Sequence, residues 1–327
     1  MPDNSKNIIS SEKELKRQKQ PWWRWLITAA AIGLFVYVIS QQGWEEFVTT
    51  LKTVSPPYAL AGLALLFVSR QAVAARWYAL LKVSEKQIHY WETLKLTYAG
   101  FFATNFLPTS IGGDLVRFIG MTQRGADGAL VVASLIMDRI IGMAGMSLVL
   151  PGGIYMVTHP ISAAIATVPF SQMVAAGGFG IPLQRLWGKI LGFLKTILNN
   201  LLFWVKRPKN LLLAFLFTLL HELLLFGMLW FFLRSLGEEV SFWTVASLYS
   251  LSYLATLIPL SIGGLGIQEM SITYLFSQFG GVSMQAALAL AVLNRMAFLF
   301  NSLPGVFVLP SVLKEKDKTQ RTKTEKN

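Results

Sequence analysis

Two arginines lie inside long apolar stretches, at corresponding places in the two halves of the sequence. Arg139 follows Asp138, and Arg295 follows Asn294. Ionisable side chains within a membrane span are costly and therefore usually functional, and a guanidinium group can donate two hydrogen bonds at once to a phosphate. We therefore expect Arg139 and Arg295 to contact an anion. The alternative is internal pairing, with Asp138 and Asn294 as the nearest polar neighbours.

A six-residue element accompanies each arginine. Residues 108–113 read Pro-Thr-Ser-Ile-Gly-Gly, and residues 259–264, which begin 151 positions later, read Pro-Leu-Ser-Ile-Gly-Gly. The proline would end one helix, the glycines would permit a tight turn, and a new helix could begin near Asp114. Unpaired N–H groups at such a helix start attract anions. The alternative is that both elements are helix breaks that allow tight packing.

The predicted site combines these elements with the arginines. The predicted lipid- or anion-binding residues are Ser110, Gly112, Gly113, Arg139, Ser261, Gly263, Gly264 and Arg295. The predicted polar or proton-handling residues are Arg70, Asp114, Asp138, Glu222, Glu269 and Asn294.

Three of the polar residues carry specific expectations. Glu269 should lie in the first turns of the helix that follows the second glycine pair. Glu222 follows His221 in mid-segment, so the two could handle protons or form hydrogen bonds between helices. Arg70 should lie deep in its segment, whereas Arg76, near Lys82, should extend to the inner membrane surface.

The motifs argue against catalysis. The chain has no cysteine and three histidines, no Walker lysine follows either glycine pair, and Glu269 replaces the third glycine of a dinucleotide fingerprint. We therefore expect that the protein is not an enzyme and that it holds no cofactor and no metal ion.

The composition predicts an all-α polytopic membrane protein. Of 327 residues, 54% are hydrophobic and 14% charged, and the mean hydropathy is +0.51; a soluble domain could not bury so much apolar surface. We expect seven to nine crossings. The candidate stretches are residues 25–40, 58–81, 89–107, 129–150, 153–176, 211–233, 242–259 and 286–309.

The repeat predicts two related halves, at residues 57–180 and 209–311 of a single transmembrane domain, 21–313. Basic loops remain on the cytoplasmic side of membrane proteins, and this rule places residues 89 and 242 at opposite membrane faces. The halves should therefore be inverted, each with a broken or re-entrant Gly-Gly helix. An amphipathic basic linker, 183–210, should join them.

The net charge of +12 resides largely in flexible tails, 1–20 and 314–327, and in short loops. This distribution indicates membrane topology rather than nucleic-acid binding. We expect a cell-membrane protein with both termini in the cytoplasm.

The two Pro-x-Ser-Ile-Gly-Gly elements, the Gly-Ile-Gln-Glu that ends at Glu269, and the Asp138-Arg139 and Asn294-Arg295 pairs resemble the lysylphosphatidylglycerol synthase transmembrane-region family, whose members are flippase-like integral membrane proteins. The resemblance covers most of residues 25–310 and implies handling of phospholipids or glycolipids. Some members carry a soluble aminoacyl-transferase domain. Only 14 residues remain from Lys314 onward, so we expect no such domain in this chain.

These observations together predict a lipid flippase or transporter. An anionic or phosphate-bearing lipid, either a phospholipid or a polyprenyl-linked glycolipid, would cross through a central polar cavity. The alternative is a membrane scaffold or accessory subunit of an enzyme of lipid modification or cell-envelope biosynthesis, with the basic tails recruiting a cytoplasmic biosynthetic enzyme.

Overall fold

The computed structural model describes residues 45, 48–49, 52–83, 87–106, 112–159, 204, 207–257, 265–310 and 312. Helices account for all the regular structure in these ranges, as the sequence predicts. In order they are α4 (Pro56–Leu81), α5 (Tyr90–Phe106), α6 (Gly112–Gln123), α7 (Gly128–Thr158), α10 (Pro208–Ser235), α11 (Phe242–Leu257), α12 (Ile267–Phe279) and α13 (Met284–Ser302).

Four of these helices, α4, α7, α10 and α13, are long and apolar enough to cross a membrane. A helix rises about 1.5 Å per residue, so roughly 20 residues span the hydrocarbon layer. Large apolar side chains are exposed on their outer faces, including Leu60, Leu148, Leu216 and Phe300. Such surfaces suit lipid contact and identify a membrane protein.

Local sequence signals explain where the long helices begin. Prolines stand in the first turns of α4 and α10, where the missing N–H group is not needed. The Asp127 side chain accepts a hydrogen bond from Leu130 N at 2.9 Å and caps α7. Ser283 caps α13 in the same way through Ala286 N, at 3.3 Å.

Helix α7 differs from the prediction in one respect. Two separate stretches, 129–150 and 153–176, were expected, but a single helix continues through Pro151 to Thr158. A proline removes one hydrogen bond, and neighbouring helices can compensate for that loss in a membrane bundle. Here Gly153 lies against α11, where an added Cβ atom would be 2.6 Å from Ser247 O.

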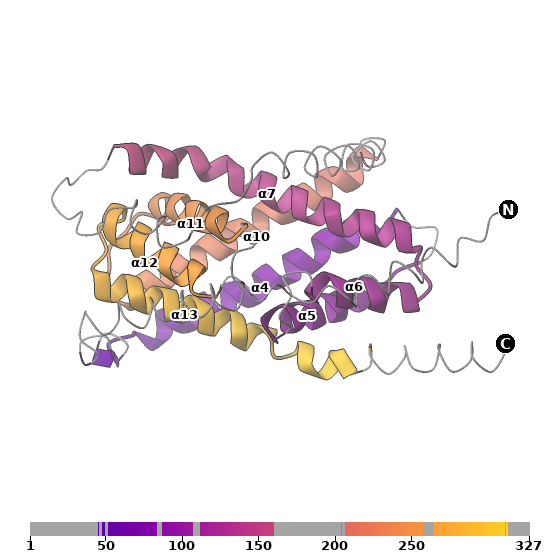
Figure 1. Cartoon of the computed structure of the whole chain (residues 1–327), viewed down its shortest axis with the longest axis horizontal. Helices are drawn as coiled ribbons and strands as arrows, with labels where there is room; N and C mark the ends of the chain where they lie inside the picture. The colour runs from indigo at the N-terminus through magenta and orange to yellow at the C-terminus, as the bar shows by residue number, and fades with distance from the viewer. Residues whose placement is uncertain are drawn as a thin grey trace, which may run out of the picture.

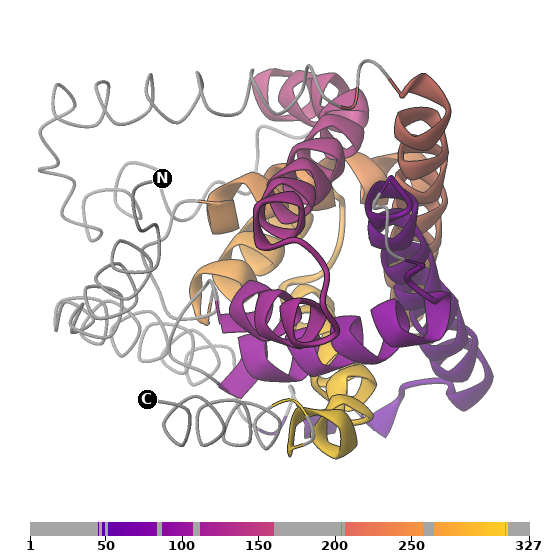
Figure 2. The same ribbon diagram turned by 90° about the vertical axis from the view of Figure 1, so that its right-hand side faces the viewer.

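Helices α4 and α10 run antiparallel, side by side along one flank of the bundle (Figures 1 and 2). At one end Ser55 N donates to Ser235 O at 2.9 Å. At the other end Asn210 Nδ2 donates to Ala79 O at 2.9 Å, and Arg207 Nη1 donates to Val83 O at 3.0 Å. The start of each helix therefore lies beside the end of the other.

The helix contacts are reciprocal between the two halves. If α4 to α7 are matched in order with α10 to α13, each contact has a counterpart: α7 packs on α11 as α13 packs on α5, and α7 packs on α10 as α13 packs on α4. The remaining contacts of α5 and α6 correspond likewise to those of α11 and α12. Reciprocal contacts of this kind are typical of a two-fold relation.

The short helix α6 begins at the first glycine pair, at Gly112, whereas α12 begins at Ile267, shortly after the second pair. With 12 and 13 residues, neither is long enough to cross a membrane alone. Gly113 lies directly against α5, and a Cβ atom there would be 2.5 Å from Gly100 O. This contact gives Gly113 a packing role.

Several predicted features lie outside the described residues. They are both tails, the apolar stretch 25–40, most of the linker 183–210, and the site residues Ser110, Ser261, Gly263 and Gly264.

Candidate functional site

A buried carboxylate joins two arginines between α4, α6 and α7. Arg76 Nε donates to Asp138 Oδ1 at 2.6 Å, and Arg117 Nη2 donates to Asp138 Oδ2 at 3.2 Å. The guanidinium group of Arg117 also stacks on Trp77, with 4.1 Å between its central carbon and the ring centroid. All three charged side chains are buried.

A second aspartate extends these contacts toward the surface. Asp114 Oδ1 accepts from Arg117 Nη1 at 3.4 Å, and Asp114 Oδ2 accepts from Arg139 Nε at 2.7 Å. The Arg139 side chain is 57% exposed. We call these five residues the ionic network: Arg76, Arg117, Arg139, Asp114 and Asp138. The network contains three guanidinium groups and two carboxylates, and the carboxyl group of Glu222 is a further electrostatic neighbour of Arg76.

The second half contains a smaller counterpart of this network. Arg295 Nε is ion-paired with Glu269 Oε1. Glu269 lies in the first turn of α12, as predicted, and its other oxygen accepts from Gly266 N at 2.7 Å. Asp114 and Arg139 are 25 residues apart, and Glu269 and Arg295 are 26 apart. In each half, a carboxylate from the first turn of the short helix pairs with an arginine of the next helix.

The predicted arginine sites therefore have carboxylate partners, but not the adjacent residues considered from sequence. Asp138 and Arg139 point to different neighbours because successive helix positions are about 100° apart. Asn294 is buried, and its Oδ1 atom has no hydrogen-bond partner among the residues that the structure describes. The predicted anion contacts of Arg139 and Arg295 remain predictions.

The expectation for Arg76 was wrong. Its side chain turns into the bundle toward Asp138 instead of extending along the lipid to the membrane surface. A buried carboxylate offers a guanidinium group a strong charge-assisted partner. Sequence reasoning also missed Arg117 as a network member, although its position three residues after Asp114 on one helix face was a usable signal.

The two halves differ in buried charge. At the repeat offset of 151 residues, Gly227 corresponds to Arg76 and Gln268 to Arg117. Asn294 corresponds to Asp138 after a five-residue slip. The ionic trio of the first half is thus replaced in the second half by three uncharged residues.

Helices α4 and α10 meet through polar side chains near their midpoints. Ser69 Oγ and His221 Nδ1 are 2.6 Å apart. This contact supports the interhelical hydrogen-bonding interpretation of His221. Glu222 is buried beside Gly145 of α7, where a Cβ atom would be 2.6 Å from Glu222 Oε2. Within the described ranges, Glu222 Oε1 has no hydrogen-bond partner.

Gly112 and Gly113 are buried at the start of α6. Among the described residues, no group of three or more His, Asp and Glu side chains is arranged to hold a metal ion.

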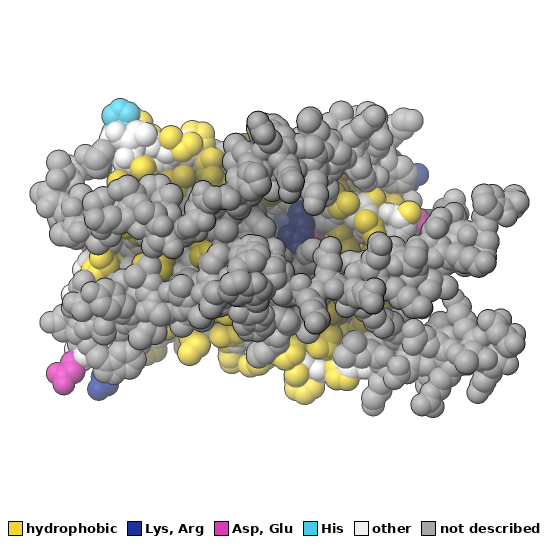
Figure 3. Space-filling view, viewed as in Figure 1, with side chains coloured by type: hydrophobic (Ala, Val, Ile, Leu, Met, Phe, Trp, Pro, Cys, Tyr) yellow, Lys and Arg dark blue, Asp and Glu magenta, His cyan; other side chains and the backbone are white. Residues whose placement is uncertain are grey.

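In the space-filling view, basic atoms appear in the middle of one face as well as toward its ends (Figure 3).

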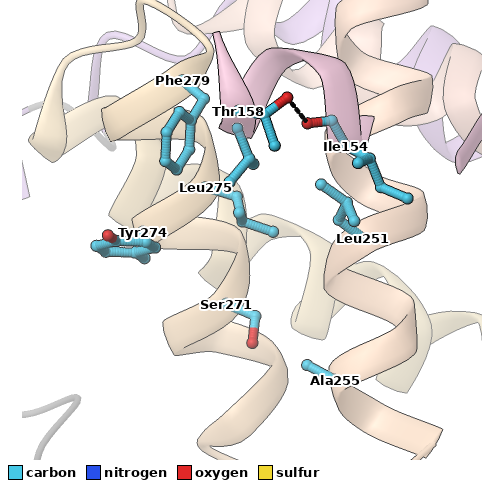
Figure 4. A pocket seen from close by; sticks show the side chains of 9 residues that line it. Ile154, Thr158, Leu251, Ala255, Ser271, Tyr274, Leu275 and Phe279 are labelled. Carbon is cyan, nitrogen blue, oxygen red and sulfur yellow. Dashed lines mark hydrogen bonds between the residues drawn. The ribbon is translucent and has the colours of Figure 1, made fainter. Parts of the chain in front are cut away.

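An apolar groove lies between α7, α11 and α12 (Figure 4). Its volume is about 360 Å³, within the range of small-molecule pockets. Ala255 and Ser271 lie toward one end, and Thr158 and Phe279 toward the other. Its lining is formed by Ile154, Val157, Thr158, Leu251, Ala255, Ser271, Tyr274, Leu275 and Phe279.

The fold and the buried charges define the class: a helical membrane protein whose apolar helices enclose charged side chains, with α4 and α10 packed antiparallel. Residues 22–305 match the family described as the lysylphosphatidylglycerol synthase TM region, and the chain belongs to this family. This assignment confirms the resemblance seen in the sequence.

A curated relative is the UPF0104 membrane protein PH1989 of Pyrococcus horikoshii. It is 21% identical over 328 residues, which cover 88% of this chain and 96% of the relative. The similarity therefore extends over nearly the whole of both proteins.

Proposed function

We propose that this protein moves an anionic or phosphate-bearing lipid across the membrane without changing it chemically. The observation that carries the proposal is the ionic network inside an apolar bundle, with its three guanidinium groups. Charges at membrane depth are costly and mark substrate pathways in transporters. Guanidinium groups suit an anionic headgroup.

The internal repeat supports transport over a purely structural role. Transporters built from inverted repeats hold their substrate between the halves and alternate its exposure by moving one half against the other. The antiparallel α4 and α10 and the reciprocal helix contacts agree with such a relation. In this proposal the halves are inverted, and the helices after the glycine pairs are re-entrant.

The apolar groove fits the hydrophobic part of such a substrate. Tyr253 of α11 lies within electrostatic range of Arg139 and Arg76 of the ionic network. Leu251 and Ala255 on the same helix line the groove. Helix α11 thus separates a charged region for a headgroup from an apolar region for a hydrocarbon chain.

Lipid movement in vesicles tests the proposal. The purified chain is reconstituted with a fluorescent phosphatidylglycerol analogue, and its transfer between leaflets is followed by quenching from one side. We expect transfer well above protein-free vesicles, reduced at least tenfold in Arg139→Ala combined with Arg295→Ala. A matched control is Arg234→Ala, which removes a peripheral pair with the exposed Glu239. Transfer no faster than in protein-free vesicles, together with co-purification of a biosynthetic enzyme, would favour the scaffold alternative.

A further inference from the structure

Arg70 is a buried cation at the junction of the two halves. It lies near the middle of α4 and is 7% exposed. Its neighbour Ser69 contacts His221 of α10, so Arg70 follows directly on the contact between α4 and α10.

Two aromatic rings pack against the Arg70 guanidinium group. Its central carbon is 4.4 Å from the centroid of Phe101 and 4.4 Å from that of Phe298. Phe101 belongs to α5 in the first half and Phe298 to α13 in the second. The N–H donors at the edge of a guanidinium group can bind phosphate or carboxylate with two parallel hydrogen bonds.

Arg70 differs from the other buried arginines. Arg76, Arg117 and Arg295 are each ion-paired, whereas Arg70 has no hydrogen bond or ion pair with any residue that the structure describes. A buried charge without a counter-ion is strongly unfavourable. An anion bound at its edge would compensate for this cost.

Two tyrosines add donors near the same place. Tyr98 and Tyr249, which correspond to each other in the repeat, are electrostatic neighbours of Arg70. Gln71 Nε2 donates to the Tyr98 hydroxyl at 3.0 Å, and Gln268 Nε2 donates to the Tyr249 hydroxyl at 3.4 Å. Because each hydroxyl accepts from a glutamine, its own proton is left to donate to a ligand.

We propose that Arg70, Tyr98 and Tyr249 form an oxyanion site for a phosphate group at the junction of the halves. The inference deepens the proposed function, on which it rests, because it adds a binding site for the headgroup phosphate at Arg70 to the ionic network. Phe101 and Phe298 pack against the guanidinium group, and one tyrosine from each half donates to the bound oxygens.

Binding to the purified full-length chain tests the site. The probes are short-chain phosphatidylglycerol, inorganic phosphate and short-chain diacylglycerol, with melting temperature in detergent as the readout. We expect phosphatidylglycerol to raise the melting temperature and diacylglycerol to leave it unchanged. A rise with inorganic phosphate at the same concentration would identify a free anion, rather than a lipid headgroup, as the ligand of this same site.

The variants separate binding from folding. Arg70→Met keeps an apolar stem between the rings and should weaken phosphatidylglycerol binding about 10- to 100-fold, the loss expected for hydrogen bonds to a charged group. Without ligand it should melt no lower than the wild type, because an uncompensated charge has been removed. Arg234→Met is the control, since Arg234 also stacks on an aromatic ring, with 5.1 Å to the Trp230 centroid, and lies away from the junction.

Unchanged binding in Arg70→Met would overturn the inference. If that variant does not fold, the double variant Tyr98→Phe with Tyr249→Phe decides, and wild-type affinity there would likewise overturn it. The transport assay keeps the two proposals apart. Wild-type transport that is equally fast in Arg70→Met removes only the Arg70 site, whereas a wild-type protein that binds the lipid but does not move it removes only the transport function.

Discussion

Arg76 Nε lies 2.6 Å from Asp138 Oδ1, and both side chains are buried between α4 and α7. Asp138 also accepts from Arg117, so a single carboxylate compensates two buried guanidinium groups. The corresponding positions of the second half hold Gly227, Asn294 and Gln268, and the bundle forms there without these charges.

Asp138→Asn should therefore destabilise the protein strongly. It leaves two buried arginines short of a counter-charge, which costs about 3–5 kcal/mol in comparable cases. The triple variant with Arg76→Met, Arg117→Gln and Asp138→Asn should be closer to the wild type, because the unpaired charges are gone. Denaturant unfolding in detergent measures both. A triple variant that loses as much stability as the sum of its single changes would contradict a shared network.

Gly113→Ala should loosen the contact between α5 and α6. The added Cβ atom would be 2.5 Å from Gly100 O, so one helix must shift, at a cost of about 1–3 kcal/mol. Gly128→Ala is the control, because a Cβ atom there meets nothing nearer than 3.7 Å; its effect should stay within about 0.5 kcal/mol. Equal effects of the two substitutions would argue against close packing at Gly113.

Ser69 and His221 should be energetically coupled. Their side chains form the hydrogen bond at the α4–α10 crossing, and comparable bonds in membrane proteins contribute about 0.6–1.7 kcal/mol. A double-mutant cycle with Ser69→Ala and His221→Leu measures the coupling. Thr97→Val provides the comparison, since the Thr97 hydroxyl donates to Thr93 O of its own helix. Zero coupling between Ser69 and His221 would show that the contact does not stabilise the crossing.

Cysteine labelling can test the inverted orientation directly, because the natural chain contains no cysteine. Gln87 precedes α5 and Glu239 precedes α11, and both side chains are exposed. We expect an impermeant thiol reagent to label Glu239→Cys in intact cells and Gln87→Cys only after permeabilisation. Labelling of both from the same side would rule out inverted halves.

Ala255→Trp should fill the apolar groove. Transfer of a long-chain lipid should fall at least tenfold, while transfer of a short-chain analogue with the same headgroup should be nearly unchanged. Leu216→Trp on the outer face of α10 is the control for a bulky aromatic residue at an exposed position. If long-chain transfer survives Ala255→Trp, the groove does not hold the hydrocarbon chain.

The sequence predicted the helices well where apolar runs ended at clear breaks. The predicted stretches 58–81, 211–233 and 242–259 correspond to α4, α10 and α11. The predicted helix break at Pro151 was wrong. A proline in the sequence suggests a break, but the packing of α7 against α11 supports a continuous helix.

The polar residues were found from sequence more readily than their partners. Arg139, Arg295 and Glu269 stood out because ionised residues are rare in apolar runs. That Glu269 pairs with Arg295, and Asp114 with Arg139, depends on how successive helices pack. Arg70 contacts Phe101, 31 positions away (101 − 70), and Phe298, 228 positions away (298 − 70). No local sequence pattern predicts such contacts.

The crossing of α4 and α10 has a mechanical consequence. Each helix leads into its own half, and the two run in opposite directions with a polar contact near their midpoints. If each half moves as a rigid body about this contact, a tilt that opens the bundle at one membrane face closes it at the other. A side chain close to this contact, such as Arg70, would hardly be displaced by that tilt.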